Sequence, residues 1–296
     1  MAAPFFRILG ETLRRFDRDR CFQYSIIISY FALMCAVPLV ALFAWITARV
    51  MGNSEIAVRS LNLFTEDFFA RFSPSFFEKM SSISDSFNQL GWVGIIGSLI
   101  AASLLFSNLI RIINEIFRTN YQRSFVYNRM MEYLIMFVTG VILFISLSIT
   151  AVWTAVHGAI ESSDFVITYL NPGVVAFFDN VFIQYLIPLA LSILVLFVIY
   201  KFIPERKVHT RAALLAAVIA AVLWEVFKRL FVVYVVRFSA IGIVISKLVQ
   251  GTLTSIIFFL LWLSFSLAIM LWGAELAAVV NERLDARAPA AGPAAA

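Results

Sequence analysis

The sequence predicts an all-α fold, a polytopic membrane bundle of about six transmembrane helices. Hydrophobic residues make up 62% of the chain and charged residues only 14%, whereas soluble domains average roughly 45–50% and 25%. The apolar residues also come in blocks of about 20 residues or more, each long enough to cross about 30 Å of hydrocarbon as a helix. We therefore expect most of the chain to lie in the lipid bilayer.

Apolar length predicts the spanning helices, which together form a transmembrane domain over residues 24–283. The expected spans are 24–48, 91–113, 130–156, 181–203, 211–236 and 253–280. Residues 284–296 are rich in alanine and proline and are expected to form a disordered tail.

Two segments outside these spans are amphipathic. In residues 1–23, apolar residues recur at helical spacing beside arginines, which predicts a cytoplasmic helix lying in the membrane interface. The apolar positions are Phe5, Leu9, Leu13 and Phe16, and the arginines are Arg7, Arg14, Arg15 and Arg18. Residues 55–90 mix phenylalanines with charges, so we expect short amphipathic helices in this first outer loop.

The basic residues predict the orientation of the chain. With a cytoplasmic N-terminus, fifteen of the twenty-three lysines and arginines lie on the inner side, as the positive-inside rule requires. An even number of spans then places the C-terminus in the cytoplasm as well. The predicted location is the bacterial inner membrane.

Ionisable residues within apolar blocks are the candidate site residues, because each costs about 2.5–3.5 kcal/mol to insert without a partner or a cavity. Glu225 lies inside the fifth span, and Lys228 and Arg229 follow one turn later, beside Trp224. Either these four residues line a substrate path, or Glu225 forms an ion pair with Lys228 and Arg229 within the helix that reaches the outer interface. Alanines 213, 217 and 221 precede them at four-residue spacing, which predicts a helix face packed against the bundle.

A second candidate group lies at the cytoplasmic ends of the second and last spans. Arg111, Asn114 and Glu115 fall at the end of 91–113, and Glu275 falls at a similar depth in 253–280. An Arg111 to Glu275 pair would close the inner gate of a cavity. The alternative is that these are ordinary interfacial charges.

Three stretches resemble the YihY/virulence factor BrkB family of bacterial inner-membrane proteins. They are ISYFALMCAVPLV at 28–40, the basic loop and alanine-rich helix with Trp224-Glu225 at 203–238, and FFLLWLSFSLAIMLWGAELAAV at 258–279. The family usually has Tyr-Gly before the last helix, where this chain has Gln250-Gly251, so no role is carried over for that tyrosine. The resemblance implies a six-helix inner-membrane protein, with suggestions of transport, including of lipids.

Some members of that family carry an old ribonuclease BN label, which this sequence does not support. RNA hydrolysis needs metal ligands or an acid–base pair outside the bilayer, and the only histidines here are His157 and His209. The sequence also has no nucleotide-binding P-loop and no common hydrolase motif. We therefore expect no enzyme, no cofactor, no bound metal and no nucleic-acid partner.

The sequence leaves two functions open. The first is a transporter or flippase-like protein for an amphiphilic, lipid-like or anionic substrate. The second is a non-catalytic membrane scaffold or envelope assembly factor, whose phenylalanine-rich outer loop binds an envelope protein. An ion channel is the weaker third reading, because no filter-like segment is present. Membrane lipids are expected partners in each case, and the sequence does not give the oligomeric state.

Overall fold

The structure is a computed structural model that describes residues 2–35, 92–119, 186–234 and 252–286, together with most of 127–142. Within these ranges every regular element is a helix and no residue is in a strand, which confirms the all-α prediction. The expected outer loop over 55–90, the loop over 157–180 and the tail beyond residue 286 lie outside the described residues. The number of transmembrane helices stays a prediction.

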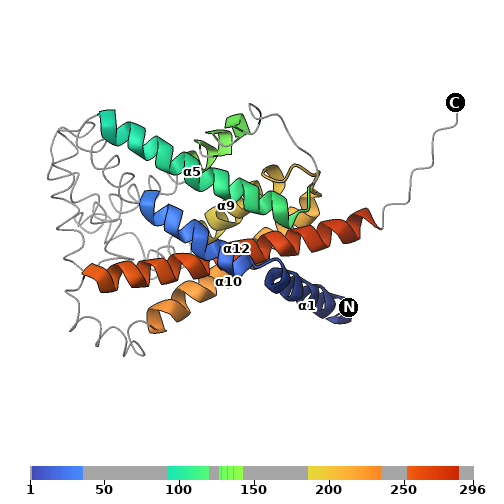
Figure 1. Cartoon of the computed structure of the whole chain (residues 1–296). Coiled ribbons are helices and arrows are strands. Elements are labelled where there is room, and N and C mark those ends of the chain that lie inside the picture. The colour runs from blue at the N-terminus through green and yellow to red at the C-terminus, as the bar shows by residue number, and fades with distance from the viewer. Residues whose placement is uncertain are drawn as a thin grey trace, which may run out of the picture. The chain divides into compact units, whose positions relative to one another are not determined.

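The labelled helices follow the order α1 (Ala2–Arg18), α5 (Trp92–Ile116), α9 (Ile187–Phe202), α10 (Thr210–Val233) and α12 (Thr252–Asp285) (Figure 1). A further apolar helix covers Cys21–Cys35, and residues between 127 and 142 are also helical. By length and apolar composition, segments Leu99–Ile116 and Ile256–Asp285 are candidate membrane spans. At 34 residues, α12 would extend about 51 Å at 1.5 Å per residue, well beyond a single hydrocarbon layer.

Two of the helices end in a left-handed residue that is not glycine. Arg20 follows α1 and Arg118 follows α5, each with a φ of 51°. After α5, the Thr119 N–H donates to the Asn114 carbonyl at 3.2 Å and the Arg118 N–H donates to the Glu115 carbonyl at 3.0 Å. This is the Schellman pattern of helix termination, in which glycine is the usual left-handed residue.

The chain divides into two compact units. The first comprises Met1–Asp19, Ile110–Val226 and Ile269–Ala296, and the second comprises Arg20–Leu109 and Phe227–Ala268. In the second unit, a hydroxyl pair joins helix Cys21–Cys35 to α12, with Ser29 Oγ 2.9 Å from Ser264 Oγ. Phe265 of α12 packs with its ring centroid 5.8 Å from Phe22 and 5.7 Å from Phe227. Hydrogen bonds between serine side chains of neighbouring helices are common in membrane proteins.

The core of the first unit is the C-terminal half of α12. The seven consecutive residues 273–279 are all buried, so every side of about two helical turns is covered by protein. Across from them, α10 contributes a set of fully buried alanines, namely Ala212, Ala213, Ala216, Ala217, Ala220 and Ala221. This confirms the prediction that the small-residue face of the fifth expected span packs against the bundle.

Candidate functional site

Three helices of the first unit are in close contact at Gly273. A Cβ atom built on Gly273 would overlap the hydroxyl of Tyr200 on α9 and would lie 2.7 Å from the Cβ of Ala220 on α10. Only a residue without a side chain fits this position of α12. We call the contact of Tyr200, Ala220 and Gly273 the glycine seam.

Tyr200 fixes the geometry of the glycine seam. Its side chain is completely buried, and its hydroxyl donates a hydrogen bond of 2.7 Å to the carbonyl oxygen of Met270. A buried phenol needs such a partner, because an unsatisfied hydroxyl costs about 1–3 kcal/mol. The bond therefore sets the register between α9 and α12.

Glu275 follows the glycine seam on α12 and none of its surface is exposed. The adjacent positions on the helix carry small or apolar side chains, Ala274 and Leu276, and both are also fully buried. An ionisable side chain placed this deeply is expensive in any apolar surroundings. Among the predicted site residues, all of which the structure describes, Glu275 is the one that is completely buried.

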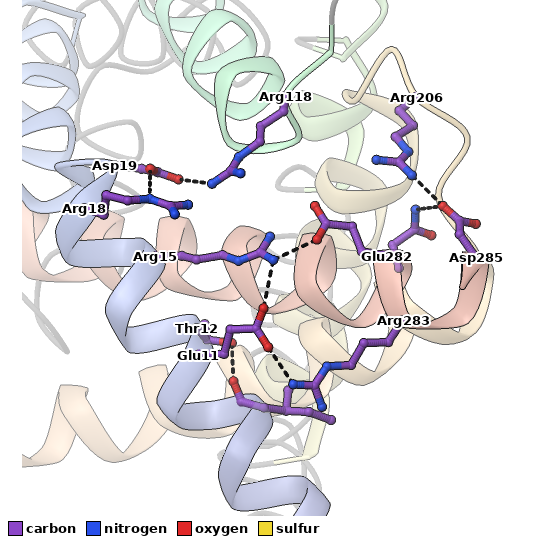
Figure 2. A network of polar contacts seen from close by, with 12 residues as sticks. Glu11, Thr12, Arg15, Arg18, Asp19, Arg118, Arg206, Glu282, Arg283 and Asp285 are labelled. Atoms are coloured by element: carbon purple, nitrogen blue, oxygen red, sulfur yellow. Dashed lines mark hydrogen bonds and ion pairs between the residues drawn. The ribbon is translucent and has the colours of Figure 1, made fainter. Parts of the chain in front are cut away.

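A set of four linked charged side chains lies at the end of α12, two turns beyond Glu275 (Figure 2). Arg15 Nη2 donates to Glu11 Oε1 and to Glu282 Oε2, each at 2.8 Å. Arg283 Nη2 donates at 2.5 Å to the other oxygen of the same carboxylate, Glu11 Oε2. Glu282 and Arg283 are neighbours on α12, so the backbone of α12 completes the loop that these three bonds begin. We call this set the α1–α12 ring.

The hydrogen bonds of the ring shift the pKa values of Glu11 and Arg15. The pKa of Glu11 is lowered from its ordinary 4.5, chiefly by the hydrogen bond from Arg283, while burial opposes the shift. The pKa of Arg15 is raised, chiefly by its hydrogen bond to Glu282. Isolated surface ion pairs contribute about 0–1 kcal/mol, but only 15% of the Arg15 side chain is exposed. The ring consequently holds α1 against the end of α12 more firmly than separate pairs would.

A second polar cluster ties the loop between α9 and α10 to α12. Asn281 is almost fully buried, and its Oδ1 accepts a hydrogen bond of 2.7 Å from the backbone N–H of His209. One turn further, Asp285 accepts a bond of 2.7 Å from Arg206 Nη2, and its other oxygen lies 2.9 Å from His209 Nε2. Figure 2 shows the contact of Arg206 with Asp285 beside the α1–α12 ring.

The predicted inner-gate residues differ in how deeply they are buried. Asn114 on α5 accepts a hydrogen bond of 2.9 Å from the backbone N–H of Glu205, through its Oδ1. Arg111 and Glu115 are exposed on the same helix, whereas Glu275 is completely buried. The pairing of Arg111 with Glu275 stays a prediction, as does the gate itself.

The predicted path residues all lie on α10, within about one and a half turns. Trp224, Glu225 and Lys228 are half-buried, and Arg229 is exposed. The full burial of the alanine face therefore ends before this cluster. Its role as a substrate path stays a prediction.

Sequence reasoning missed Glu11, Asn281 and Asp285, as well as Tyr200. A signal was available for Glu11, because Glu11 and Arg15 have the spacing of an intrahelical ion pair. The run NERLD that ends α12 was also a signal, since charges that follow a long apolar helix have left the hydrocarbon. Their partners could not be identified, because those partners lie up to 272 positions away.

The family profile of the virulence factor BrkB proteins matches residues 12–296. A UPF0761 membrane protein of Acinetobacter baylyi is 26% identical over 96% of the chain, which covers 65% of that relative. UPF0761 membrane proteins of Alteromonas mediterranea and Vibrio campbellii are 23% and 24% identical and are covered over 91% and 83% of their lengths. The chain thus spans just under two thirds of the Acinetobacter relative and most of the other two. No solved structure matches the chain.

Proposed function

Because the chain belongs to the virulence factor BrkB family and its relatives are named as membrane proteins, we propose that it is a multi-pass transporter. The proposed location is the bacterial inner membrane, with about six spanning helices and both termini in the cytoplasm. The proposed substrate is amphiphilic, lipid-like or anionic, so the action resembles that of a flippase. The proposal includes no chemical conversion, no cofactor and no nucleic-acid partner.

The observation that carries this proposal is the complete burial of Glu275 in a helix long and apolar enough to span a membrane. Ionisable residues at such positions commonly mark substrate or proton pathways. Glu275 lies two residues beyond Gly273, where α9, α10 and α12 are in close contact. A charge change at Glu275 would therefore act directly on the packing of three helices.

The remaining site residues take the following proposed roles. Glu225, Lys228, Arg229 and Trp224 line the substrate path along α10. Arg111, Asn114 and Glu115 act with Glu275 as the inner gate. Since the sequence has no P-loop, ATP does not drive the process directly, and membrane gradients or the substrate gradient supply the energy.

Two isosteric variants test this function, Glu225→Gln and Glu275→Gln. Each keeps the volume and hydrogen-bonding capacity of the side chain but removes its charge. If the carboxylates serve transport, the variants should retain their melting temperature in detergent and lose complementation of a deletion strain. They should also lose movement of a fluorescent lipid across the bilayer of proteoliposomes. Lys228→Met is the matched variant for the opposite charge on α10.

The outcome that contradicts transport is equally specific. If Glu225 only neutralises Lys228, then Glu225→Gln leaves a poorly solvated cation and lowers stability instead. Folded variants of Glu225 and Glu275 with full activity in cells would remove the main support for a transporter.

A scaffold or assembly factor is the second candidate, and the glycine seam favours it. Contact as close as that between Gly273, Tyr200 and Ala220 suits a bundle that holds one conformation. In this case the phenylalanine-rich segment at 55–90, outside the described residues, would bind an envelope protein. Deleting that segment should then abolish cellular function and co-purification of the partner, while lipid movement in proteoliposomes is absent from the start.

A further inference from the structure

Helix α1 has three sides with different surroundings, and the first packs against the end of α12. Glu11 and Arg15 take part in the α1–α12 ring. Thr12 lies on this side as well, is completely buried, and donates its hydroxyl to the Ile8 carbonyl at 2.9 Å. The rotation of α1 about its own axis is therefore fixed by its contact with α12.

The second side of α1 is an exposed apolar edge. Phe6 is 69% exposed and Leu13 is 58% exposed. Seven residues apart, they lie within about 20° of each other around the helix. Leu9 and Phe16 flank them and are half-buried. Exposed apolar side chains that gather on one edge, in contrast to ones scattered singly, mark a surface that contacts a membrane or a partner.

The third side is a row of exposed arginines. Arg7, Arg14 and Arg18 have the spacing of one helical face, about 100–140° from the apolar edge and next to Glu11 of the first side. Arg118, which follows α5, joins the end of the row, because its side chain is 48% exposed and it shares Asp19 with Arg18. Glu11 is bound by Arg15 and Arg283 and Asp19 by Arg18 and Arg118, so Arg7 and Arg14 carry most of the positive charge that this side offers.

We propose that α1 docks on the anionic phospholipids of the leaflet that it faces. The apolar edge enters the acyl boundary, and Arg7, Arg14 and Arg18 bind the phosphate headgroups. Such a division between an apolar face and an arginine-rich face is typical of interfacial helices that select anionic lipid. Because the α1–α12 ring couples α1 to α12, lipid charge would be transmitted to the end of the helix that carries Glu275. This inference deepens the lipid partnership of the proposed function but does not require transport.

The test uses the full chain in nanodiscs of pure phosphatidylcholine and of phosphatidylcholine mixed equally with phosphatidylglycerol. Hydrogen–deuterium exchange of residues 2–18 reports docking of α1, and native mass spectrometry counts the bound phosphatidylglycerol. Each arginine near an anionic surface changes affinity about fivefold, so Arg7→Gln with Arg14→Gln should lower it on the order of 25-fold. Lys207→Gln with Arg211→Gln is the control, because it removes the same charge from exposed positions outside α1.

The expected result is stronger protection of α1 with anionic lipid in the wild type and in the control, but not in the α1 variant. Phe6→Ser with Leu13→Ser should lower protection in both lipids, because the apolar edge acts without regard to headgroup charge. Equal loss in the control and the α1 variant would overturn the proposal in favour of general charge attraction. Protection by inorganic phosphate alone, or protection unaffected by lipid charge, would overturn it as well. Lipid movement measured on the same samples separates this proposal from transport, since docking can succeed where transport is absent.

Discussion

Replacing Gly273 by alanine tests whether the glycine seam has the geometry described above. Alanine is more favourable than glycine inside a helix by about 1 kcal/mol, so in open space the change would stabilise the protein. At the glycine seam, however, the new Cβ would overlap the Tyr200 hydroxyl, and it would lie 2.7 Å from the Ala220 Cβ and 2.9 Å from the Tyr200 Cζ. Overpacking costs about 1–3 kcal/mol, and displacing Tyr200 loses about 1 kcal/mol of hydrogen bonding. The net expectation is destabilisation by about 1–3 kcal/mol.

The control for this experiment is Gly10→Ala in α1, where a Cβ would meet no described atom within 4 Å. Thermal unfolding in detergent should therefore show a higher Tm for Gly10→Ala and a lower one for Gly273→Ala. A rise in Tm for Gly273→Ala similar to that of the control would refute the packing described here.

Tyr200→Phe supplies the second half of the test, because it removes the hydroxyl that the new Cβ would overlap. Alone it should cost about 1 kcal/mol through the lost bond to the Met270 carbonyl. Combined with Gly273→Ala, it should relieve part of the overlap, so the double variant is more stable than the sum of the two losses predicts. Additivity within about 0.5 kcal/mol would mean that the two residues do not interact.

Two further predictions concern α10 and the α1–α12 ring. Ala217→Leu on the fully buried face of α10 should lower stability by about 1–3 kcal/mol through overpacking. Val218→Leu at the adjacent exposed position should change Tm little, and equal Tm values for the two variants would contradict the burial. Because the pKa of Glu11 is lowered in the fold, its carboxylate stabilises the protein above about pH 4.5, and this stabilisation disappears as the pH falls through the lower folded value. The Tm advantage of wild type over Glu11→Gln should vanish in acid, and a pH-independent difference would contradict the assignment.

The helices could be predicted from sequence where a local property sufficed. Apolar length alone located α5, α10 and α12, and the 3.6-residue period of apolar and basic residues located α1. The alanine face of α10 was predictable for a similar reason, since small residues four positions apart lie on one side of a helix. Each of these signals is contained within a few turns of chain.

The surroundings of Glu275 could not be predicted in this way. A helix inside a membrane protein is apolar toward lipid and apolar toward its neighbours, so α12 shows no period that separates the two. The structure instead buries residues 273–279 on all sides. Sequence reasoning placed Glu275 at the inner end of the last span but could not show that protein surrounds it.

The α1–α12 ring and the glycine seam depend on residues that are distant in the sequence. Glu11 meets Arg283, and Tyr200 meets Met270. No local rule selects these partners from the other arginines or carbonyls of the chain. A glycine in an apolar helix likewise gives no sign of whether another helix touches it, and Gly10 and Gly273 differ completely in this respect.

The positions of these two features limit how Glu275 can act. The glycine seam holds α12 two residues before Glu275, and the α1–α12 ring holds it from Glu282 onward. Between two such fixed points, about two turns of helix cannot rotate without breaking either the Tyr200 bond or the bonds of Arg15. A transport cycle that exposes Glu275 must therefore open the glycine seam, or move other helices away from α12 while α1 and the end of α12 stay together. Opening the glycine seam costs the buried bond from Tyr200 to the Met270 carbonyl, whereas moving helices that belong to neither contact leaves both the seam and the ring intact. The moving parts of a transporter of this fold would therefore be helices outside the glycine seam and the α1–α12 ring.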